Sequence, residues 1–283
     1  MEVLITGTNG FIGRNLKEFF EKKAYNLKCP KRGELNLLDS DAVYNYLKDN
    51  KFDAIIHLGV TLTSVEENLK MYFNIERCSA FFGKLICVGS GAEFDMRNYQ
   101  PKMDESYFKK HIPTDIYGFS KYVIARDIET NPANIYNLRV WGIYGKYEDY
   151  SRRFISNNIC RLLSGLDISI NRNMYFDYLY VDDFSRIVEA FIENTPKKKI
   201  YNTCSGERVG LVDLAKMINE VHGGGSNIIV KQEGENPEYT GDNSMFLKEF
   251  DSIRFTKVQD AIREMYDWYK NESNIEFDPE VFR

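Results

Sequence analysis

The stretch Thr6-Gly7-Thr8-Asn9-Gly10-Phe11-Ile12-Gly13 decides the fold of this chain. It follows an apolar, β-branched run at residues 3–6 and precedes an amphipathic stretch at residues 12–22, so its glycines lie between a strand and a helix. Glycines in such a turn let backbone N–H groups approach a pyrophosphate, and the helix directs its positive N-terminus at that anion. A tight turn without a ligand is the alternative. We favour dinucleotide binding by Gly7, Asn9, Gly10, Phe11, Ile12 and Gly13.

Apolar runs alternate with helical patterns around this turn. Strands are predicted at residues 3–6, 25–29, 54–58, 85–88 and 135–140, and helices at 12–22, 41–49, 66–79 and 116–130. This alternation predicts an α/β fold of the Rossmann type, a doubly wound parallel sheet. Beyond residue 150 the pattern loosens, with helices predicted at 153–163, 183–193, 212–221 and 257–269 and short strands at 168–170, 174–176, 199–202 and 227–231. We expect a Rossmann domain of residues 1–165 that also receives 182–222, and a smaller, interleaved substrate lobe of 166–181 and 223–283.

Composition narrows the class of protein. The net charge of −5 argues against partners such as nucleic acid or an anionic membrane. No apolar stretch is long enough for a membrane span, and the strand predicted at the N-terminus leaves no room for a signal peptide. The five cysteines are scattered and the three histidines lie far apart, so we expect reduced thiols, no metal site and a cytoplasmic enzyme.

The end of the second predicted strand bears on the cofactor. NAD-binding proteins place an acid there to hold the ribose 2′-hydroxyl. This chain has Lys28-Cys29-Pro30-Lys31-Arg32 instead, with no acid. Lys31 or Arg32 could pair with a 2′-phosphate, which favours NADP over NAD; a solvated basic loop is the alternative.

Three residues have the chemistry of a hydride-transfer site. Tyr117 and Lys121 are spaced Y-x-x-x-K on a predicted helix and therefore share one face. An ammonium beside a tyrosine favours the phenolate form, which suits acid/base work. Ser90 follows the fourth predicted strand, at the sheet edge that faces ligands. We expect His57 to be structural, and the Asp182-Asp183 pair to cap the helix predicted at residues 183–193.

These motifs together resemble the extended short-chain dehydrogenases/reductases of the NAD-dependent epimerase/dehydratase family, whose members act on nucleotide sugars. The resemblance covers nearly the whole chain. It rests on the glycine stretch, Asn36-Leu37-Leu38-Asp39, Ile56-His57-Leu58-Gly59-Val60, Asn74, Ser90, Tyr117, Lys121, and the segments 138–145, 176–183 and 201–207. It implies that Ser90, Tyr117 and Lys121 are catalytic, and that Tyr117 and Lys121 also contact the cofactor with Asp39, Leu58, Gly59 and Asn74. It further implies a substrate site of Ser90, Gly91, Gly142, Arg172 and Tyr178, and a homodimer formed through the Tyr117 helix and its neighbour.

Two positions depart from the family pattern. Gly142 replaces an Asn near the substrate, and Phe176 replaces an Arg that often holds the nucleotide pyrophosphate. Arg172, Arg152 or Arg153 could supply that positive charge. The basic pair favours an NADPH-dependent reductase of a 4-keto-6-deoxy nucleotide sugar, with hydride transfer at C4. A 4-epimerase with tightly bound NAD and a non-catalytic dinucleotide-binding protein are the alternatives. A dehydratase is disfavoured because Gly91-Ala92 replaces the acid pair after Ser90.

Overall fold

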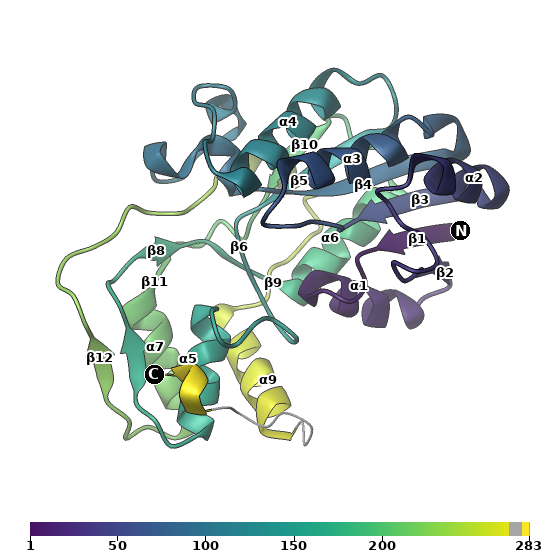
Figure 1. Ribbon diagram of the computed structural model, residues 1–283. Coiled ribbons are helices and arrows are strands. Elements are labelled where there is room, and N and C mark those ends of the chain that lie inside the picture. Colours follow the sequence, from purple (N-terminus) through teal and green to yellow (C-terminus); the bar gives the residue numbers. More distant parts are fainter. Residues whose placement is uncertain (272–278, 283) are drawn as a thin grey trace.

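The computed structural model describes residues 1–271 and 279–282, and its centre is a six-stranded parallel sheet (Figure 1). The strands lie in the order β2 (Asn26–Lys28), β1 (Glu2–Thr6), β3 (Phe52–His57), β4 (Phe82–Ser90), β5 (Ile135–Val140) and β10 (Ile200–Thr203). The predicted Rossmann-type α/β class is therefore confirmed. The strand order reverses between β1 and β3, and ligands of such sheets bind beyond the carboxyl ends of the strands at this point.

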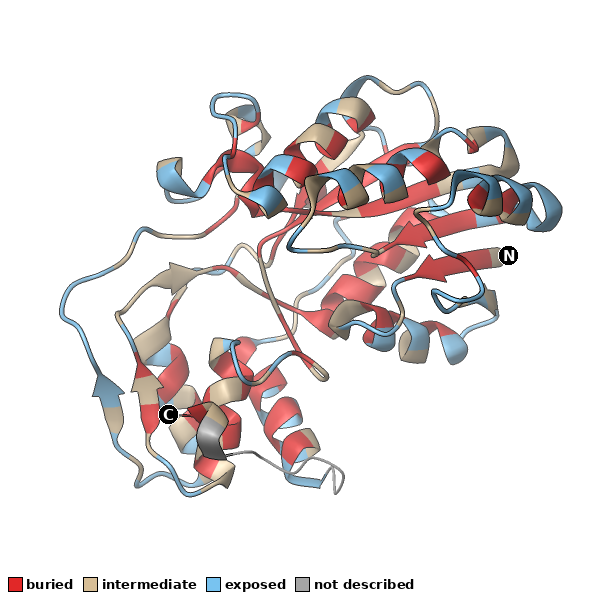
Figure 2. Cartoon of the chain, viewed as in Figure 1, coloured by how far each residue is buried: buried red, intermediate tan, exposed pale blue. Residues whose placement is uncertain are grey.

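Successive residues of the strands enter opposite cores, because side chains alternate across a pleated sheet. Val3 and Ile5 of β1 pack with α1 (Phe11–Glu21) and α6 (Val181–Glu193), whereas Leu4 packs with α2 (Ser40–Asn50), α3 (Val65–Glu76) and α4 (Ile116–Thr130). Figure 2 shows the result as strands that are buried almost throughout, covered by helices with one buried side. Both faces of the sheet are therefore covered.

The three helices on the second face each begin at a polar capping side chain. Asp39 accepts hydrogen bonds from Asp41 N and Ala42 N, Ser64 accepts from Glu67 N, and Asp115 accepts from Gly118 N. Such caps satisfy backbone N–H groups that have no partner within the helix. Asp115 thereby sets the helical position of Tyr117, two residues later.

A second hydrophobic core lies away from the sheet, among α5 (Phe154–Leu163), α7 (Leu211–His222) and α9 (Val258–Asn271) (Figure 1). Two small sheets flank these helices, β7 (Ile168–Ile170) with β12 (Ile228–Val230), and β8 (Tyr175–Phe176) with β11 (Val209–Gly210). We call these elements the lobe. The domain boundaries expected from the sequence remain a prediction, although α5 and α7 share the core of the lobe. Residues 272–278 and 283 of the expected lobe lie outside the described residues.

Several elements differ from the sequence prediction. The parallel pair β6 (Gly142–Tyr144) and β9 (Tyr178–Tyr180) and the helix α8 (Ser244–Glu249) were not predicted, because each is too short for a periodic pattern. The capping role predicted for Asp183 is wrong. Helix α6 begins at Val181, and the buried Asp183 carboxylate instead accepts from Thr256 N at 2.8 Å and from its hydroxyl at 2.7 Å.

Candidate functional site

The glycine stretch forms a turn between β1 and α1 that leaves room for backbone alone. Gly7 has a φ of +75°, a conformation that side chains with a Cβ rarely adopt. A Cβ on Gly13 would stand 2.3 Å from the Gly7 carbonyl oxygen, so helix α1 packs directly on the turn. A Cβ on Gly10 would meet only the Gly7 oxygen, at 3.5 Å. Gly10 is therefore not required for packing inside the protein.

The start of α1 is suited to an anion. Its N-cap residue, Gly10, makes no side-chain capping bond, and no acidic residue occupies the first turn of the helix. The backbone N–H groups there retain their partial positive charge. The turn and the helix start thus fit the pyrophosphate of a dinucleotide on geometry and charge.

A groove of about 400 Å³ extends from this turn toward the end of β2. Its volume falls in the range of ligand sites. Lys31 and Arg32 line it, and both are exposed. Among the described residues, the ion pairs of the structure do not include either side chain. Two positive charges are thus available to a ligand in the groove. The remaining lining residues are Thr6, Gly7, Thr8, Asn9, Pro30, Leu35, Asn36, Leu37, Leu38, Gly59, Val60, Thr61, Glu67 and Met71.

Asp39 and Asn74, both expected to contact the cofactor, support this groove from outside its lining. The Asp39 carboxylate caps α2. Asn74 is buried, donates to the Leu37 carbonyl oxygen at 2.9 Å and accepts from the Ser40 hydroxyl at 2.7 Å. These bonds fix the loop that places Leu37 in the groove. Leu58 is also expected to contact the cofactor. Its backbone carbonyl carbon lies 3.0 Å from the position that a Cβ on Gly7 would occupy.

Ser90 ends β4 and caps a single 3-10 turn, Gly91–Phe94. Its hydroxyl oxygen accepts from Ala92 N at 3.2 Å, and its N–H donates to Oε1 of Glu93 at 3.0 Å. Glu93 has no exposed surface and pairs with Arg139, which is equally buried. Ser90 is therefore held rigidly at the carboxyl edge of the sheet.

Tyr117 and Lys121 lie on α4, which packs against the Ser90 turn. A Cβ on Gly118 would stand 2.8 Å from the carbonyl oxygen of Ala92. The Lys121 ammonium donates to the carbonyl oxygen of Val88 at 2.6 Å and lies 5.8 Å from the centre of the Tyr117 ring. The structure thus brings the helix of Tyr117 and Lys121 to the strand end of Ser90.

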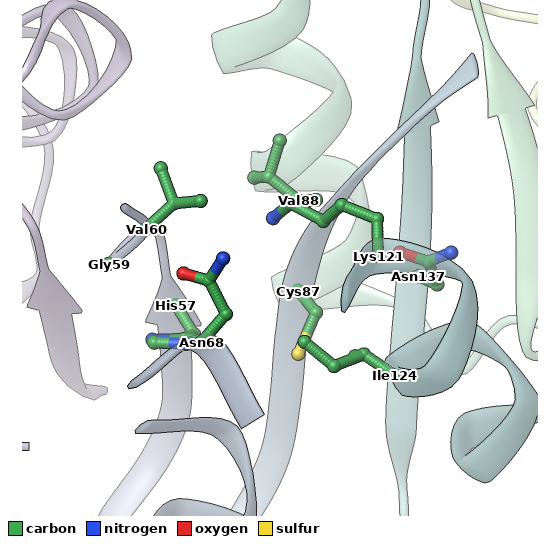
Figure 3. Close-up of a pocket in the computed structure, with 9 residues that line it drawn as sticks. All are labelled: His57, Gly59, Val60, Asn68, Cys87, Val88, Lys121, Ile124 and Asn137. Atoms are coloured by element: carbon green, nitrogen blue, oxygen red, sulfur yellow. The ribbon is translucent and has the colours of Figure 1, made fainter. Parts of the chain in front are cut away.

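A small cavity of about 10 Å³ lies beside Lys121, at the lower limit for one water molecule. Figure 3 shows Lys121 together with His57, Asn68, Cys87 and Asn137 around this space. His57 Nδ1 lies 3.0 Å from the Thr6 hydroxyl. Burial, with a smaller contribution from the charge of Lys121, lowers the pKa of His57 to about 3. A neutral, buried His57 agrees with the structural role expected for it.

The expected substrate residues fall into separate places. Gly142 pairs with β9, and a Cβ on it would stand 2.6 Å from the carbonyl oxygen of Asp177, so an Asn at this position would not fit without a shift. Tyr178 contacts the Tyr144 ring in the lobe, at 5.7 Å between ring centres. Arg172 lies between β7 and β8 and donates to Gln232 at 2.9 Å. Only Gly91 adjoins Ser90 directly.

Aromatic residues absent from the sequence prediction surround Ser90 and Gly91. The ring of Tyr239 lies 4.8 Å from Trp141 and 4.9 Å from Tyr99 between ring centres. A Cβ on Gly91 would stand 2.6 Å from the Tyr239 hydroxyl oxygen and 2.9 Å from the Trp141 ring. These rings leave no space for a side chain at position 91, so a glycine is required there. Tyr239 comes from a polar, non-periodic segment, which carries no local signal for a site.

The arrangement joins a glycine turn at a helix N-terminus, a groove lined by two basic residues, and Ser90, Tyr117 and Lys121 at one edge of a parallel sheet. A family model described as the NAD dependent epimerase/dehydratase family matches residues 3–204. The chain belongs to this family. The members of the epimerase/dehydratase family found as relatives are nucleotide-sugar epimerases, dehydratases and reductases, and the family uses NAD(P).

Three relatives show the breadth of the epimerase/dehydratase family. ADP-L-glycero-D-manno-heptose-6-epimerase of Brachyspira hyodysenteriae is 25% identical over 260 residues, which cover 78% of this chain and 81% of the relative. A GDP-L-fucose synthetase from Naegleria fowleri bound to NADP matches with a TM-score of 0.80 at 18% identity, over 95% of this chain and 94% of that one. A dTDP-glucose 4,6-dehydratase from Bacillus anthracis in complex with NAD matches with a TM-score of 0.82 at 16% identity, over 96% and 97%. The solved structures share the fold.

Two further observations concern the described part of the chain. Its helices are too short or too polar to cross a membrane. Within residues 1–271 and 279–282, no group of three or more His, Cys, Asp or Glu side chains is arranged to hold a metal ion.

Proposed function

We propose that this protein is an NADPH-dependent reductase of a nucleotide 4-keto-6-deoxysugar. The observation that carries the proposal is the pair Lys31 and Arg32, which line the cofactor groove where NAD-binding relatives place an acid. A 2′-phosphate in this groove would find two positive charges. NADPH would be held by the glycine turn, the start of α1 and this pair, and when bound it supplies hydride to a sugar carbon, C4 in this proposal.

The protein groups perform the proton chemistry. Tyr117 donates a proton to the sugar oxygen as the carbonyl is reduced, and Ser90 donates a hydrogen bond to the same oxygen. Lys121 stabilises the tyrosinate left behind, and it would hold the nicotinamide ribose when the cofactor is bound. The bond from Lys121 to Val88 anchors the ammonium beside the strand end. Positioning of this kind supplies much of the rate enhancement in such enzymes.

The alternatives are a 4-epimerase with tightly bound NAD and a dinucleotide-binding protein without turnover. A dehydratase among the structural relatives binds NAD, so NAD, the cofactor that the epimerase alternative requires, stays in consideration. A dehydratase is disfavoured by Glu93, the acid nearest to Ser90 in sequence, because its carboxylate is buried against Arg139. The second alternative is disfavoured by the presence of both Tyr117 and Lys121.

We also propose a homodimer formed through α3 and α4. Ile116 and Phe119 on α4 and Phe73 on α3 are exposed apolar side chains on neighbouring helices, which supports an interface there. A cytoplasmic location is part of the proposal, supported by the five cysteines, which are free thiols in the structure.

The test is an assay with GDP-, dTDP- and UDP-linked 4-keto-6-deoxysugars and NADPH, followed by absorbance of the reduced nicotinamide. A reductase consumes NADPH stoichiometrically with product. The same protein is incubated with UDP-glucose and UDP-galactose, and Tyr117→Phe controls for contaminating enzymes. Epimerisation without cofactor consumption, or NAD carried through purification, would overturn the proposal in favour of the epimerase.

A further inference from the structure

Aromatic rings form a continuous surface that begins beside Ser90, and we call its members, Tyr99, Tyr239, Phe176 and Tyr178, the aromatic platform. Between ring centres, Tyr239 lies 4.9 Å from Tyr99 and 5.9 Å from Phe176. Phe176 lies 5.1 Å from Tyr178. Each of these side chains is half-buried and so keeps part of its surface open, whereas Trp141, which packs on Tyr239, is only 5% exposed. The platform therefore offers apolar surface to a ligand.

The platform adjoins the residue that follows Ser90. The Tyr239 hydroxyl oxygen stands 2.6 Å from the position that a Cβ on Gly91 would occupy, so the hydroxyl end of this side chain covers Gly91. Toward the lobe, the ring of Tyr239 has Phe176 of β8 as its neighbour. A substrate whose reacting oxygen lay at Ser90 would therefore have the platform directly beside it.

Backbone hydrogen bonds hold the platform in place. Tyr239 belongs to a segment, residues 235–243, that runs from the lobe to the edge of the central sheet (Figure 1). Tyr239 N donates to the Tyr175 carbonyl oxygen at 2.9 Å, and Asp177 N donates to the Tyr239 carbonyl oxygen at 3.0 Å. On the other side of the segment, Met103 N donates to the Thr240 carbonyl oxygen at 3.2 Å. The rings are thus positioned before a ligand arrives, which lowers the entropic cost of binding.

The members of the platform carry no charge at neutral pH, because they are phenols and one phenyl ring. Asp177 lies between Phe176 and Tyr178 in the chain, but side chains alternate along a strand and its carboxylate turns away. It accepts hydrogen bonds from Ser205 N at 2.7 Å and from Gly206 N at 2.8 Å. A C–H group placed on the rings gains from leaving water, whereas a hydroxyl placed there without a partner loses its hydrogen bonds. The platform therefore favours a deoxygenated part of a ligand.

We propose that the platform binds the C5–C6 side of the substrate hexose and selects a methyl group at C6 over a hydroxymethyl group. The proposal rests on the proposed function, which places the C4 oxygen at Ser90 and Tyr117. C6 is bonded to C5, the ring neighbour of C4, so the methyl group meets the first ring beyond Gly91, that of Tyr239. A hydroxymethyl group would press its hydroxyl against the same ring. An apolar site rejects an added hydroxyl by up to about 100-fold.

Calorimetry on the full-length protein with NADP+ tests this proposal through binding alone. The ligands are GDP-, dTDP- and UDP-linked 6-deoxygalactose and galactose, so that the members of each pair differ only in the C6 hydroxyl. With the nucleotide that the protein accepts, the 6-deoxy member should bind about 10- to 100-fold more tightly. Tyr239→Phe keeps the ring and should keep this preference. Tyr239→Ala removes the ring and should reduce the preference below about threefold, because the C6 hydroxyl then meets water.

Tyr44→Ala is the matched control, because this tyrosine of α2 is exposed and lies outside the platform. It should leave the preference unchanged. Equal affinities within every pair, or no binding of any 6-deoxy member, would overturn the proposal from the wild type alone, whether or not Tyr239→Ala folds. If that wild type still reduces a 4-keto-6-deoxysugar nucleotide with NADPH, the reductase function stands. A preference that Tyr239→Ala abolishes, in a wild type that reduces none of these ketosugars, would instead support the platform and overturn the proposed function.

Discussion

Nε of Arg139 donates to Oε2 of Glu93 at 2.8 Å, and neither side chain has any exposed surface. The other carboxylate oxygen, Oε1, accepts from Ser90 N at 3.0 Å and from Asn137 Nδ2 at 3.1 Å. This buried pair therefore holds the turn that presents Ser90. Desolvation of the two charges offsets much of their attraction, whereas loss of one partner leaves the other charge buried and uncompensated.

Removing one partner of this pair should be severe. Arg139→Met leaves the Glu93 carboxylate buried without its counter-charge and should lower the free energy of unfolding by about 3–5 kcal/mol. Glu93→Gln combined with Arg139→Met should cost less than Arg139→Met alone, because no charge is then buried. Urea unfolding measures both. Lys70→Ala, which breaks the surface pair with Glu66, is the control and should cause no measurable change. A loss below about 1 kcal/mol for Arg139→Met would contradict the assignment.

Tyr117→Phe should lower turnover by about 10²–10⁴-fold, because the proton donor is lost while the ring is kept. NADPH affinity, measured by calorimetry, should stay nearly unchanged. Tyr122→Phe on the same helix is the control, since the Tyr122 hydroxyl accepts from Arg126 at 3.3 Å and its ring packs with Phe108 and Phe94. Activity of Tyr117→Phe within threefold of wild type would exclude Tyr117 as the acid/base.

Gly10 and Gly13 should respond differently to substitution. Gly13→Ala places a Cβ 2.3 Å from a backbone oxygen, so it should destabilise the fold, by about 1–3 kcal/mol as for other overpacked sites. Gly10→Val has space in the protein and should fold, but its side chain would block the approach of the pyrophosphate. Urea unfolding and calorimetry with NADPH separate the two effects. A folded Gly10→Val variant with unchanged affinity would place the cofactor elsewhere.

Arg32→Ala should weaken NADPH binding by about 10- to 150-fold, the range of a charge-assisted hydrogen bond, and leave NADH binding nearly unchanged. Added salt should erode the preference of the wild type, because Arg32 is exposed. Lys48→Ala, which removes an exposed cation from α2 outside the groove lining, is the control. Equal dissociation constants for NADH and NADPH in the wild type would refute the role of the basic pair.

Glu148 predicts a pH dependence of stability. Burial raises the pKa of Glu148 from 4.5 to about 7, outweighing its hydrogen bonds with Ser156. Below pH 4.5 the group is protonated in both states and contributes nothing. Between pH 4.5 and 7 the unfolded chain loses the Glu148 proton while the folded protein keeps it, so the free energy of unfolding falls as the pH rises. The full loss, reached above pH 7, is on the order of 3 kcal/mol. Glu148→Gln keeps an oxygen for Ser156 N and should gain Tm over wild type as the pH rises through this window. Exposed Glu233→Gln is the control. A constant difference in Tm between pH 4.5 and 7.5 would reject the raised pKa.

Local patterns account for what the sequence predicted well. The alternation of apolar runs located all strands of the central sheet and the helices on its two faces, because residue spacing of 2 or 3.6 decides which face is buried. The glycine stretch and the Tyr117–Lys121 spacing are also local, so their positions at the strand and helix ends could be expected. Asp39 and Asn74 show the limit of this approach. Their side chains support the groove rather than line it, and that difference depends on how loops close.

The sequence by itself determined the Rossmann-type sheet and located the glycine turn and the Tyr117–Lys121 spacing, since each depends on patterns among residues close together in the chain. Only the tertiary structure decided that Tyr239, 149 residues after Ser90 by the numbering, covers Gly91 with its hydroxyl, and that Arg139 and Glu93 pair with each other inside the sheet layer. Such contacts close long loops, whose entropic cost depends only weakly on length. The partners are therefore selected by packing and hydrogen bonding in three dimensions, which leave no periodic pattern in the chain.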